Sequence, residues 1–243
     1  MKTTLLTLLA ILVAGCHFDK LLQGSNGGAT RLAFATQPSN GTAGTPLSTV
    51  RVAAEDAGGR VVSSFGGDIT VSLQANPGGA TLSATVTAVN GVASFSGLEV
   101  DKAAQGYVFV GTVSGDSLRK DTSTSFDVVP GPASKLVFTV EPMDTRAGAT
   151  ISPPVQVSAL DAFDNLAVNF TGDIGVVIGH DGSLPLGGAK LSGGDPVAAV
   201  GGVATFSALS INSASVTSYY TLKAAFGTGA APVAESTQFM VNP

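Results

Sequence analysis

Short stretches in which apolar residues alternate with polar or small ones recur along most of the chain. The clearest are residues 69–73 and 174–178, and Val177 is the one apolar residue that breaks the alternation. A period of two buries one face of a β-strand, so each stretch predicts a strand with one side in a core. No stretch after Lys20 has a convincing helical period. The pattern predicts an all-β protein.

Turn-forming pairs separate these apolar runs. Asn-Gly, Gly-Gly, Pro-Gly and Asp-Asn bound them, and Asn90-Gly91 is the clearest hairpin turn because both central positions of such a turn favour positive φ. Roughly six or seven runs fall within about 105 residues, a density typical of an antiparallel sandwich.

The sequence of the first half recurs in the second half. The matched segments are Arg31–Phe34 with Lys135–Phe138, Phe65–Ile69 with Phe170–Ile174, Gly78–Leu82 with Gly187–Leu191, and Ala88–Leu98 with Ala199–Leu209. The offset grows along the chain because the second copy carries insertions between matched segments, where surface loops tolerate them. We therefore expect two tandem domains, 31–130 and 131–243, joined at Pro130-Gly131-Pro132.

The N-terminal segment has the features of a targeting signal. Lys2 precedes the apolar run Leu5–Ala14, whose ten residues suit a signal peptide and fall short of the roughly 20 that a membrane span needs. The run ends at Val13-Ala14-Gly15-Cys16, which resembles the lipobox of bacterial lipoproteins. The alternative is an ordinary secretory signal with a chance cysteine.

The lipobox resemblance implies that residues 1–15 are removed and that Cys16, the only cysteine, is acylated. Two or more acyl chains would anchor the protein stably in a membrane. His17 follows the cysteine, which by the sorting rule of diderm bacteria favours the outer membrane. Residues 16–30 then form a flexible tether rich in glycine. We expect a lipid-anchored protein of the bacterial cell envelope.

Composition narrows the function classes. A net charge of −5 disfavours nucleic acid, whose phosphates need a basic face. Charged residues make up 12% of the chain, with two histidines, so little material for catalysis is present. His180-Asp181 is interpreted as a solvated loop pair, and no metalloprotease, nucleophile-elbow or phosphate-loop motif occurs. We expect neither an enzyme nor a cofactor.

One loop offers weak calcium candidates. Asp161, Asp164 and Asn165 lie close together, and Asp173 follows eight residues later. Calcium takes six to eight oxygen ligands, some of which these side chains would supply. The alternative, which the first copy favours by placing glycine and arginine in the same loop, is a turn whose Asp and Asn bind their own backbone. We therefore predict no metal site.

Aromatic residues at matched positions of the two copies are predicted to pack in the cores, whereas Phe163 has no counterpart and is expected to be partly exposed. The matched residues are Phe34, Phe95, Tyr107 and Phe126 in the first copy and Phe138, Phe206, Tyr220 and Phe239 in the second.

Three phrases of the second copy, KLVFTVEP, VSALDAFDN and AVGGVATFSALSI, resemble bacterial Ig-like repeats of the invasin/intimin group. The resemblance covers residues 31–129 and 135–241. It implies two tandem Ig-like antiparallel β-sandwiches, although the disulfide and tryptophan of antibody-type domains are missing. Members of this group serve as stalks, spacers and sometimes adhesive tips.

Two functions remain open at this point. The first is a non-enzymatic envelope lipoprotein that acts as a structural stalk or interaction module, with a membrane and an envelope or surface protein as partners. The second is an adhesin or carbohydrate-binding module that uses the loops 179–188 and 192–198, where the second copy carries its insertions. Exposed edge strands would allow a partner to add a strand.

Overall fold

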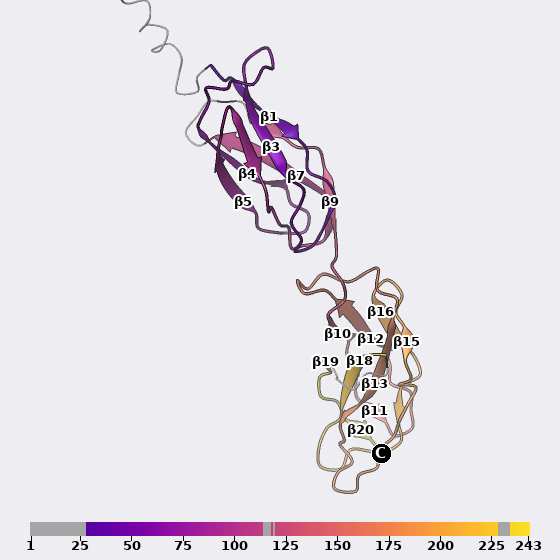
Figure 1. Cartoon of the computed structure of the whole chain (residues 1–243). Helices are drawn as coiled ribbons and strands as arrows, with labels where there is room; N and C mark the ends of the chain where they lie inside the picture. The colour runs from indigo at the N-terminus through magenta and orange to yellow at the C-terminus, as the bar shows by residue number, and fades with distance from the viewer. Residues whose placement is uncertain (1–27, 114–117, 119, 228–233) are drawn as a thin grey trace, which may run out of the picture. The chain divides into compact units, whose positions relative to one another are not determined.

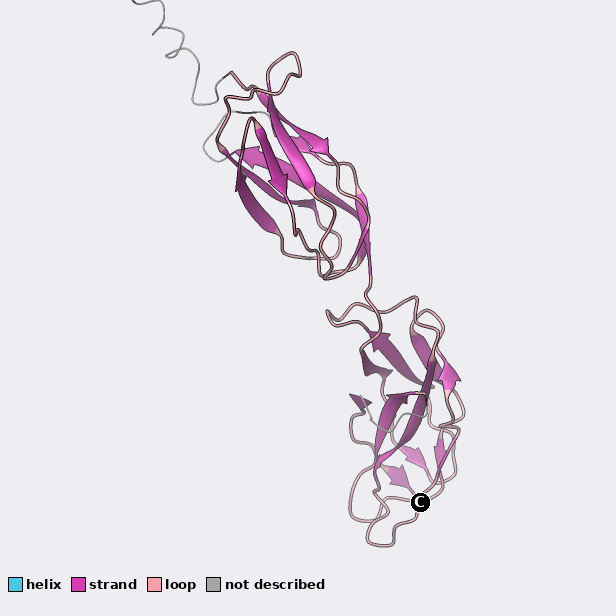
Figure 2. Ribbon diagram, in the orientation of Figure 1, coloured by secondary structure: helices cyan, strands magenta, loops and turns pink. Residues whose placement is uncertain are grey.

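The structure is a computed structural model that describes residues 28–113, 118, 120–227 and 234–243. Every regular element among these residues is a β-strand (Figure 2). Within these ranges no helix is long and apolar enough to cross a membrane. The expected signal peptide, Cys16 and most of the expected tether lie outside the described residues.

The chain divides into two compact units. The described residues up to Val128 form the first unit, apart from 42–44 and 101–103, which group with the second unit of residues 129–243. The first unit begins before the first strand, because Ala29 is buried and the Thr30 N–H donates a 2.8 Å hydrogen bond to the Glu55 carbonyl.

Two sheets build the first unit (Figure 1). One has the order β1-β3-β6, and the other has the order β2-β9-β7-β4-β5, with β8 also pairing β7. The strands are β1 (Arg31–Thr36), β2 (Gly41–Thr42), β3 (Val50–Glu55), β4 (Asp68–Ala75), β5 (Ser83–Thr87), β6 (Val92–Phe95), β7 (Ala104–Val113), β8 (Asp121–Thr122) and β9 (Phe126–Val129).

The second unit repeats this plan with a more divided second sheet. Its sheets have the orders β10-β12-β16 and β15-β13-β18-β19, with the two-stranded pairs β11-β20 and β14-β17 beside them. The strands are β10 (Lys135–Val140), β11 (Thr145–Arg146), β12 (Val155–Leu160), β13 (Asp173–His180), β14 (Leu191–Ser192), β15 (Val197–Ala198), β16 (Val203–Phe206), β17 (Ser210–Ile211), β18 (Thr221–Phe226), β19 (Ala234–Glu235) and β20 (Val241–Asn242).

The core of each unit lies between its two sheets, as the alternating pattern predicts. In the second unit Val155 and Val157 of β12 join Ile174 and Val176 of β13 in one buried cluster. The predicted core aromatics are buried in both units, except that Phe138 is only partly buried against this cluster, and Phe163 is 38% exposed as expected. The predicted all-β class with Ig-like sandwiches is confirmed, and the long strands pair antiparallel, whereas the short β11 and β20 pair in parallel.

The hairpin predicted at Asn90-Gly91 forms, with φ of 51° and 79°. The second unit has Gly201 and Gly202 at the same place, with φ of 59° and 81°. In both turns the flanking valines pair with each other. The turn therefore belongs to the repeat itself, and the same backbone shape is reached with asparagine or glycine at its first position.

Candidate functional site

The two units differ most at one edge of the second sheet. In the first unit β5 pairs with β4 without a break, from Asp68 opposite Thr87 to Ser72 opposite Ser83. In the second unit the corresponding strand β15 pairs with β13 only at residues 173 and 174. One further hydrogen bond joins the Val176 N–H to the Gly194 carbonyl. The chain before Gly194 leaves β13, and β14 pairs with β17 instead. The insertion therefore opens an edge that the first unit keeps closed.

Two glycines allow the chain to leave the sheet. Gly193 has a φ of +77°, and a Cβ there would lie 2.4 Å from the Ala208 carbonyl oxygen. A Cβ on Gly194 would lie 2.3 Å from the Val176 carbonyl oxygen. The Gly194 carbonyl also accepts a 3.0 Å hydrogen bond from the Val176 N–H, which holds the two backbones close together. Both positions need the close backbone approach that glycine permits.

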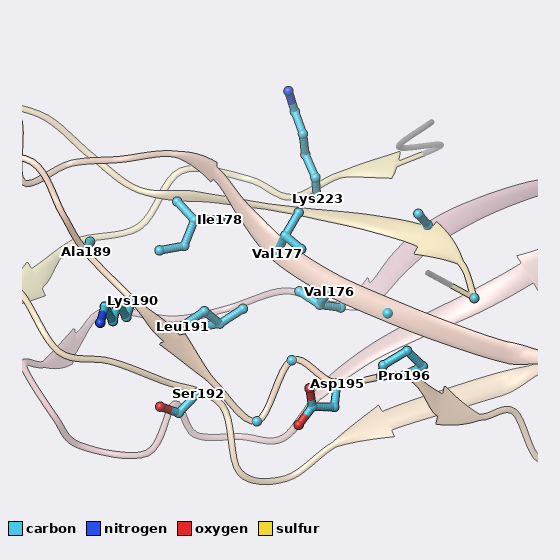
Figure 3. Close-up of a pocket in the computed structure, with 15 residues that line it drawn as sticks. Val176, Val177, Ile178, Ala189, Lys190, Leu191, Ser192, Asp195, Pro196 and Lys223 are labelled. Carbon is cyan, nitrogen blue, oxygen red and sulfur yellow. The ribbon is translucent and has the colours of Figure 1, made fainter. Parts of the chain in front are cut away.

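A cavity of about 890 Å³ occupies the space between β13 and the departing segment (Figure 3). We call it the β13 groove and define it by residues 175–178 on one side and 189–196 on the other. The residues that line it are mainly apolar or glycine and include Ile178 and Leu191, and the charged ones are Lys190, Asp195 and, from β18, Lys223. The inserted loop 192–198 thus contributes part of a cavity.

Val177 is the apolar residue that broke the period of two in the sequence. Its side chain is 61% exposed and lines the β13 groove, whereas its neighbours Ile174 and Val176 are buried in the core. The sequence pattern did not predict the groove, although Val177 and the inserted glycines are the sequence features that accompany it.

The calcium candidates form a hydrogen-bonded turn. Asp161 Oδ1 accepts hydrogen bonds from the backbone N–H groups of Phe163 (2.8 Å) and Asn165 (2.9 Å). Its Oδ2 accepts from the Asn165 side-chain amide (2.9 Å) and from the Gly131 N–H (2.8 Å). Asp164 pairs instead with the Lys135 ammonium. Both oxygens of Asp161 are therefore occupied by N–H donors.

The same turn in the first unit is built with other residues. Asp56 Oδ1 accepts 2.9 Å hydrogen bonds from the N–H groups of Gly58 and Arg60, the same spacing as around Asp161. Gly59 (φ 81°) occupies the left-handed position that Asp164 (φ 66°) occupies in the second unit. In the described ranges no three His, Cys, Asp or Glu side chains gather in a way that would hold a metal ion. A shared turn explains both loops.

Asp173 takes no part in the hydrogen bonds of this turn. It begins β13 opposite Ala198, and its backbone carbonyl accepts a 2.6 Å hydrogen bond from the Gly227 N–H. Among the described residues no hydrogen bond or ion pair joins Asp173 to Asp161, Asp164 or Asn165. The four candidate ligands therefore do not converge on one point through any bond that the structure shows.

We expect chelation to leave the protein's stability unchanged. Because N–H donors fill both oxygens of Asp161, few free carboxylate oxygens remain in this turn for an ion that takes six to eight. The measurement is the thermal unfolding midpoint of the chain in calcium-containing buffer before and after addition of EDTA. A midpoint that falls with EDTA and returns with added calcium would contradict the prediction.

We expect Asp161→Asn to destabilise the second unit by about 2–3 kcal/mol at neutral pH, because the new amide NH₂ would face the N–H donors of Asn165 and Gly131. Burial acts to raise the pKa of Asp161, but the four N–H groups that donate to the carboxylate outweigh it and hold the pKa below 3.8. This stabilisation is complete above the ordinary carboxyl pKa and is lost as pH falls through the lowered folded-state pKa.

Urea unfolding of both proteins between neutral and strongly acidic pH measures this effect. The difference between wild type and Asp161→Asn should shrink only at acid pH. Asp56→Asn is the matched control, because only its Oδ1 accepts backbone N–H groups and an amide oxygen can replace it. Equal losses for the two variants would argue against a special role for the Asp161 carboxylate.

The expectation of a solvated loop pair is wrong for His180, which ends β13 and is half-buried, and His180 forms no catalytic arrangement with Asp181. The Nε2 of His180 lies 3.1 Å from Ser218 Oγ, and its ring packs 4.7 Å from that of Tyr219. Asp181 instead accepts hydrogen bonds from the N–H and hydroxyl of Ser183, and the hydroxyl bond lowers the pKa of Asp181. In the part of the chain that the structure describes, no carboxylate bonds to His180.

The loop 179–188 also presents apolar side chains. Leu184 is 47% exposed and Leu186 is 81% exposed. The loop is held to residues 216–217, because the Val216 N–H donates to the Gly182 carbonyl and the Thr217 hydroxyl donates to the Leu184 carbonyl. Both inserted loops of the second unit are therefore ordered, but only residues 192–196 line the β13 groove.

Comparisons with known proteins found no matching protein-family model and no matching curated protein. Among solved structures the chain is similar to FdeC, a broadly conserved Escherichia coli adhesin, at 18% identity and a TM-score of 0.40, covering 86% of this chain and 63% of that one. It is also similar to invasin, a bacterial integrin-binding protein, at 16% identity and a TM-score of 0.30, covering 86% and 38%.

The fibronectin(III)-like modules of CbhA from Clostridium thermocellum are similar at 11% identity and a TM-score of 0.26, covering 87% of this chain and 94% of that one. The chain spans less than two thirds of the FdeC and invasin structures. Identities and TM-scores this low say nothing about what this chain binds.

Proposed function

We propose that the protein is a non-enzymatic interaction module of the bacterial cell envelope, anchored by lipid on Cys16, with its binding site in the second repeat. The β13 groove carries this proposal, because the same edge is closed by β5 in the first repeat. In chain order, the first repeat (31–130) then serves as a spacer between the anchor and the binding repeat (131–243). The protein acts as a stalk with one specialised domain.

Support for the lipid anchor comes from the sequence Val13-Ala14-Gly15-Cys16 after a ten-residue apolar run. Mass spectrometry of the membrane-extracted protein should find acyl chains on Cys16, and Cys16→Ala should lack them because the thiol that carries them is absent. Protease treatment of intact cells then distinguishes surface display from a periplasmic location. A protein that reaches the membrane fraction with no acyl chain on Cys16 would contradict the lipid anchor and leave an ordinary signal sequence.

Support for binding over catalysis comes from the residues around the cavities. The β13 groove is lined by aliphatic side chains, glycines and a few surface charges. A separate cavity of about 420 Å³ includes Ser218 beside His180, but no carboxylate orients that histidine among the described residues. A nucleophilic serine needs a base that is itself held in place, which this pair lacks.

The binding claim is tested on an array of glycans, host-matrix proteins and envelope proteins, probed with the mature chain. The matched control replaces Leu191–Ala198 with the shorter Leu82–Thr87 of the first repeat, which should restore the closed edge. We expect a ligand that the intact chain binds and this edge-closed variant does not. A ligand bound equally by both proteins, or no ligand at all, would overturn the assignment of binding to the groove.

Carbohydrate is the alternative ligand class for this surface. The two insertion segments carry exposed residues, such as Leu184 and Leu186 in 179–188, which suits an adhesive contact. However, no aromatic ring is among the described residues that line the β13 groove, and aromatic faces are what sugar stacking requires. The glycans on the array distinguish a carbohydrate ligand from a protein ligand.

A further inference from the structure

We infer that the β13 groove binds an extended polypeptide segment, which adds to β13 as an antiparallel strand. This inference rests on the proposed function and names the class of partner. The occupant is a segment with apolar side chains at alternate positions. It would complete the sheet order β15-β13-β18-β19 where β15 stops short.

The backbone of β13 supplies the first part of the evidence. Successive residues of a strand direct their N–H and C=O groups to opposite neighbours. The Val176 N–H donates to Gly194 on the groove side, so the N–H and C=O of Ile178 face the same side. Past residue 176, no strand in the described part of the chain pairs with β13 on this side. Such an edge is a template for another strand.

The first repeat shows what occupies this position when the edge is closed. Residues 83–87 lie there as β5, antiparallel to β4, with Val71 opposite Ala84 and Ile69 opposite Val86. Val176 and Ile174 are the counterparts of Val71 and Ile69 in the second repeat. In the second repeat Val197 still pairs with Ile174, and Gly194 still accepts a hydrogen bond from Val176. The vacant part of the edge therefore begins at Ile178, and the first repeat supplies a model only of how an extended chain lies along such an edge.

Side chains of the groove define what the occupant should carry. In β5 the alternating residues Ala84 and Val86 are partly buried while Ser83, Thr85 and Thr87 are exposed. The groove likewise offers Ile178 and Leu191, whereas Val176, which also lines it, is 2% exposed and belongs to the core. A peptide whose apolar residues alternate would pack them against this wall while its backbone pairs with Ile178.

The exposed Val177 and the glycines beside it fit the same occupant. Gly175 and Gly179 flank Val177 on the outward face of β13. On the β18 side Val177 lies opposite Lys223, whose side chain also covers Gly179. A new cross-strand neighbour can therefore pack on Val177 only from the groove side. A lysine at position 177 would place a charge in that contact.

The probe is a displayed library of random peptides of about ten residues, the upper length of an ordinary strand, panned against the full mature chain. Binders that the edge-closed variant also captures are discarded. We expect enriched sequences with alternating apolar residues. In the complex, the Ile178 amide should show a large NMR shift and slowed hydrogen exchange.

Backbone methylation of the peptide separates strand addition from side-chain binding. Methylating the alternate amides that face β13 should weaken binding by about tenfold or more, because hydrogen bonds worth about 1 kcal/mol each are lost. Methylating the amides of the opposite set should have little effect. Val177→Lys should also weaken binding, whereas Val200→Lys, at an 82% exposed valine of the hairpin, should not.

Several outcomes would overturn the inference. The first is failure to enrich any groove-dependent peptide, and the second is an equal effect of the two methylation patterns on binding. The third is a dimer of the chain that disappears in the edge-closed variant, which would show that a second copy is the occupant. If the array instead yields a groove-dependent glycan, strand addition is wrong and the proposed function stands. If neither experiment yields a groove-dependent ligand, both fail.

Discussion

Tyr220→Ala is expected to destabilise the second unit by about 3–5 kcal/mol, the usual cost of removing a large buried aromatic side chain. Tyr220 is fully buried in the core between the sheets, and its ring centroid lies 6.1 Å from that of Phe239. Its hydroxyl donates a 3.0 Å hydrogen bond to the Ser213 carbonyl. Burial raises the pKa of Tyr220, so the phenol stays protonated at neutral pH.

Chemical denaturation followed by NMR resonances of each unit measures this loss. Tyr220→Phe is the matched control, because it keeps the ring and removes only the hydroxyl, at a cost of about 1–2 kcal/mol. Tyr107→Ala removes the corresponding buried ring from the first unit. Equal losses for Tyr220→Ala and Tyr220→Phe would show that the ring itself contributes nothing to the core.

Gly202→Ala is expected to cost the second unit about 2–4 kcal/mol, from a left-handed backbone and a steric clash together. Gly202 has a φ of +81°, and a Cβ there would lie 2.6 Å from the Ala167 carbonyl oxygen. That oxygen belongs to the backbone, so the collision cannot be relieved by turning a side chain. The hairpin between β15 and β16 would have to move.

Gly201→Asn is the matched control one residue earlier. Nothing lies within 4 Å of a Cβ at Gly201, and the first repeat has Asn90 in the same turn with a φ of 51°. Asparagine tolerates this conformation, so the variant should be as stable as the wild type. Thermal or urea unfolding compares the two variants, and similar losses for both would refute the steric explanation.

The sandwich fold was predictable because the same sequence pattern occurs in both repeats. Matched aromatic positions such as Phe95 and Phe206 can share a role in both copies only if each copy buries them, and both are 1% exposed. The turn at Asn90-Gly91 was predictable for a local reason, since its geometry depends on two adjacent residues. The alternation at Ile174 and Val176 likewise reports burial directly.

The Asp161 turn shows what internal comparison adds. The first repeat has Gly59 and Arg60 in place of Asp164 and Asn165. Asp56 nevertheless accepts hydrogen bonds from backbone N–H groups at the same spacing as Asp161. The sequence alone leaves a cation and a turn as alternatives, because both use the oxygens of Asp and Asn. Only the direction of the N–H groups distinguishes them, and the sequence does not contain that direction.

The β13 groove was beyond reach of the sequence for a different reason. The insertion near Gly193 and Gly194 was visible as a shift between the copies. Whether such residues bulge outward or draw the edge strand away depends on carbonyl contacts from Val176 and Ala208, which are distant in sequence. Val177 carried a local signal, but an exposed valine is common on protein surfaces.

Amide hydrogen exchange along β13 in the full mature chain tests the central claim most directly, with and without a ligand that the chain captures. If the second repeat binds through its open edge, the Ile178 amide should exchange more slowly once the ligand is bound. The Val71 amide, whose strand is already paired with β5 in the first repeat, should not change. Slowed exchange in the first repeat, with Ile178 unaffected, would contradict the claim.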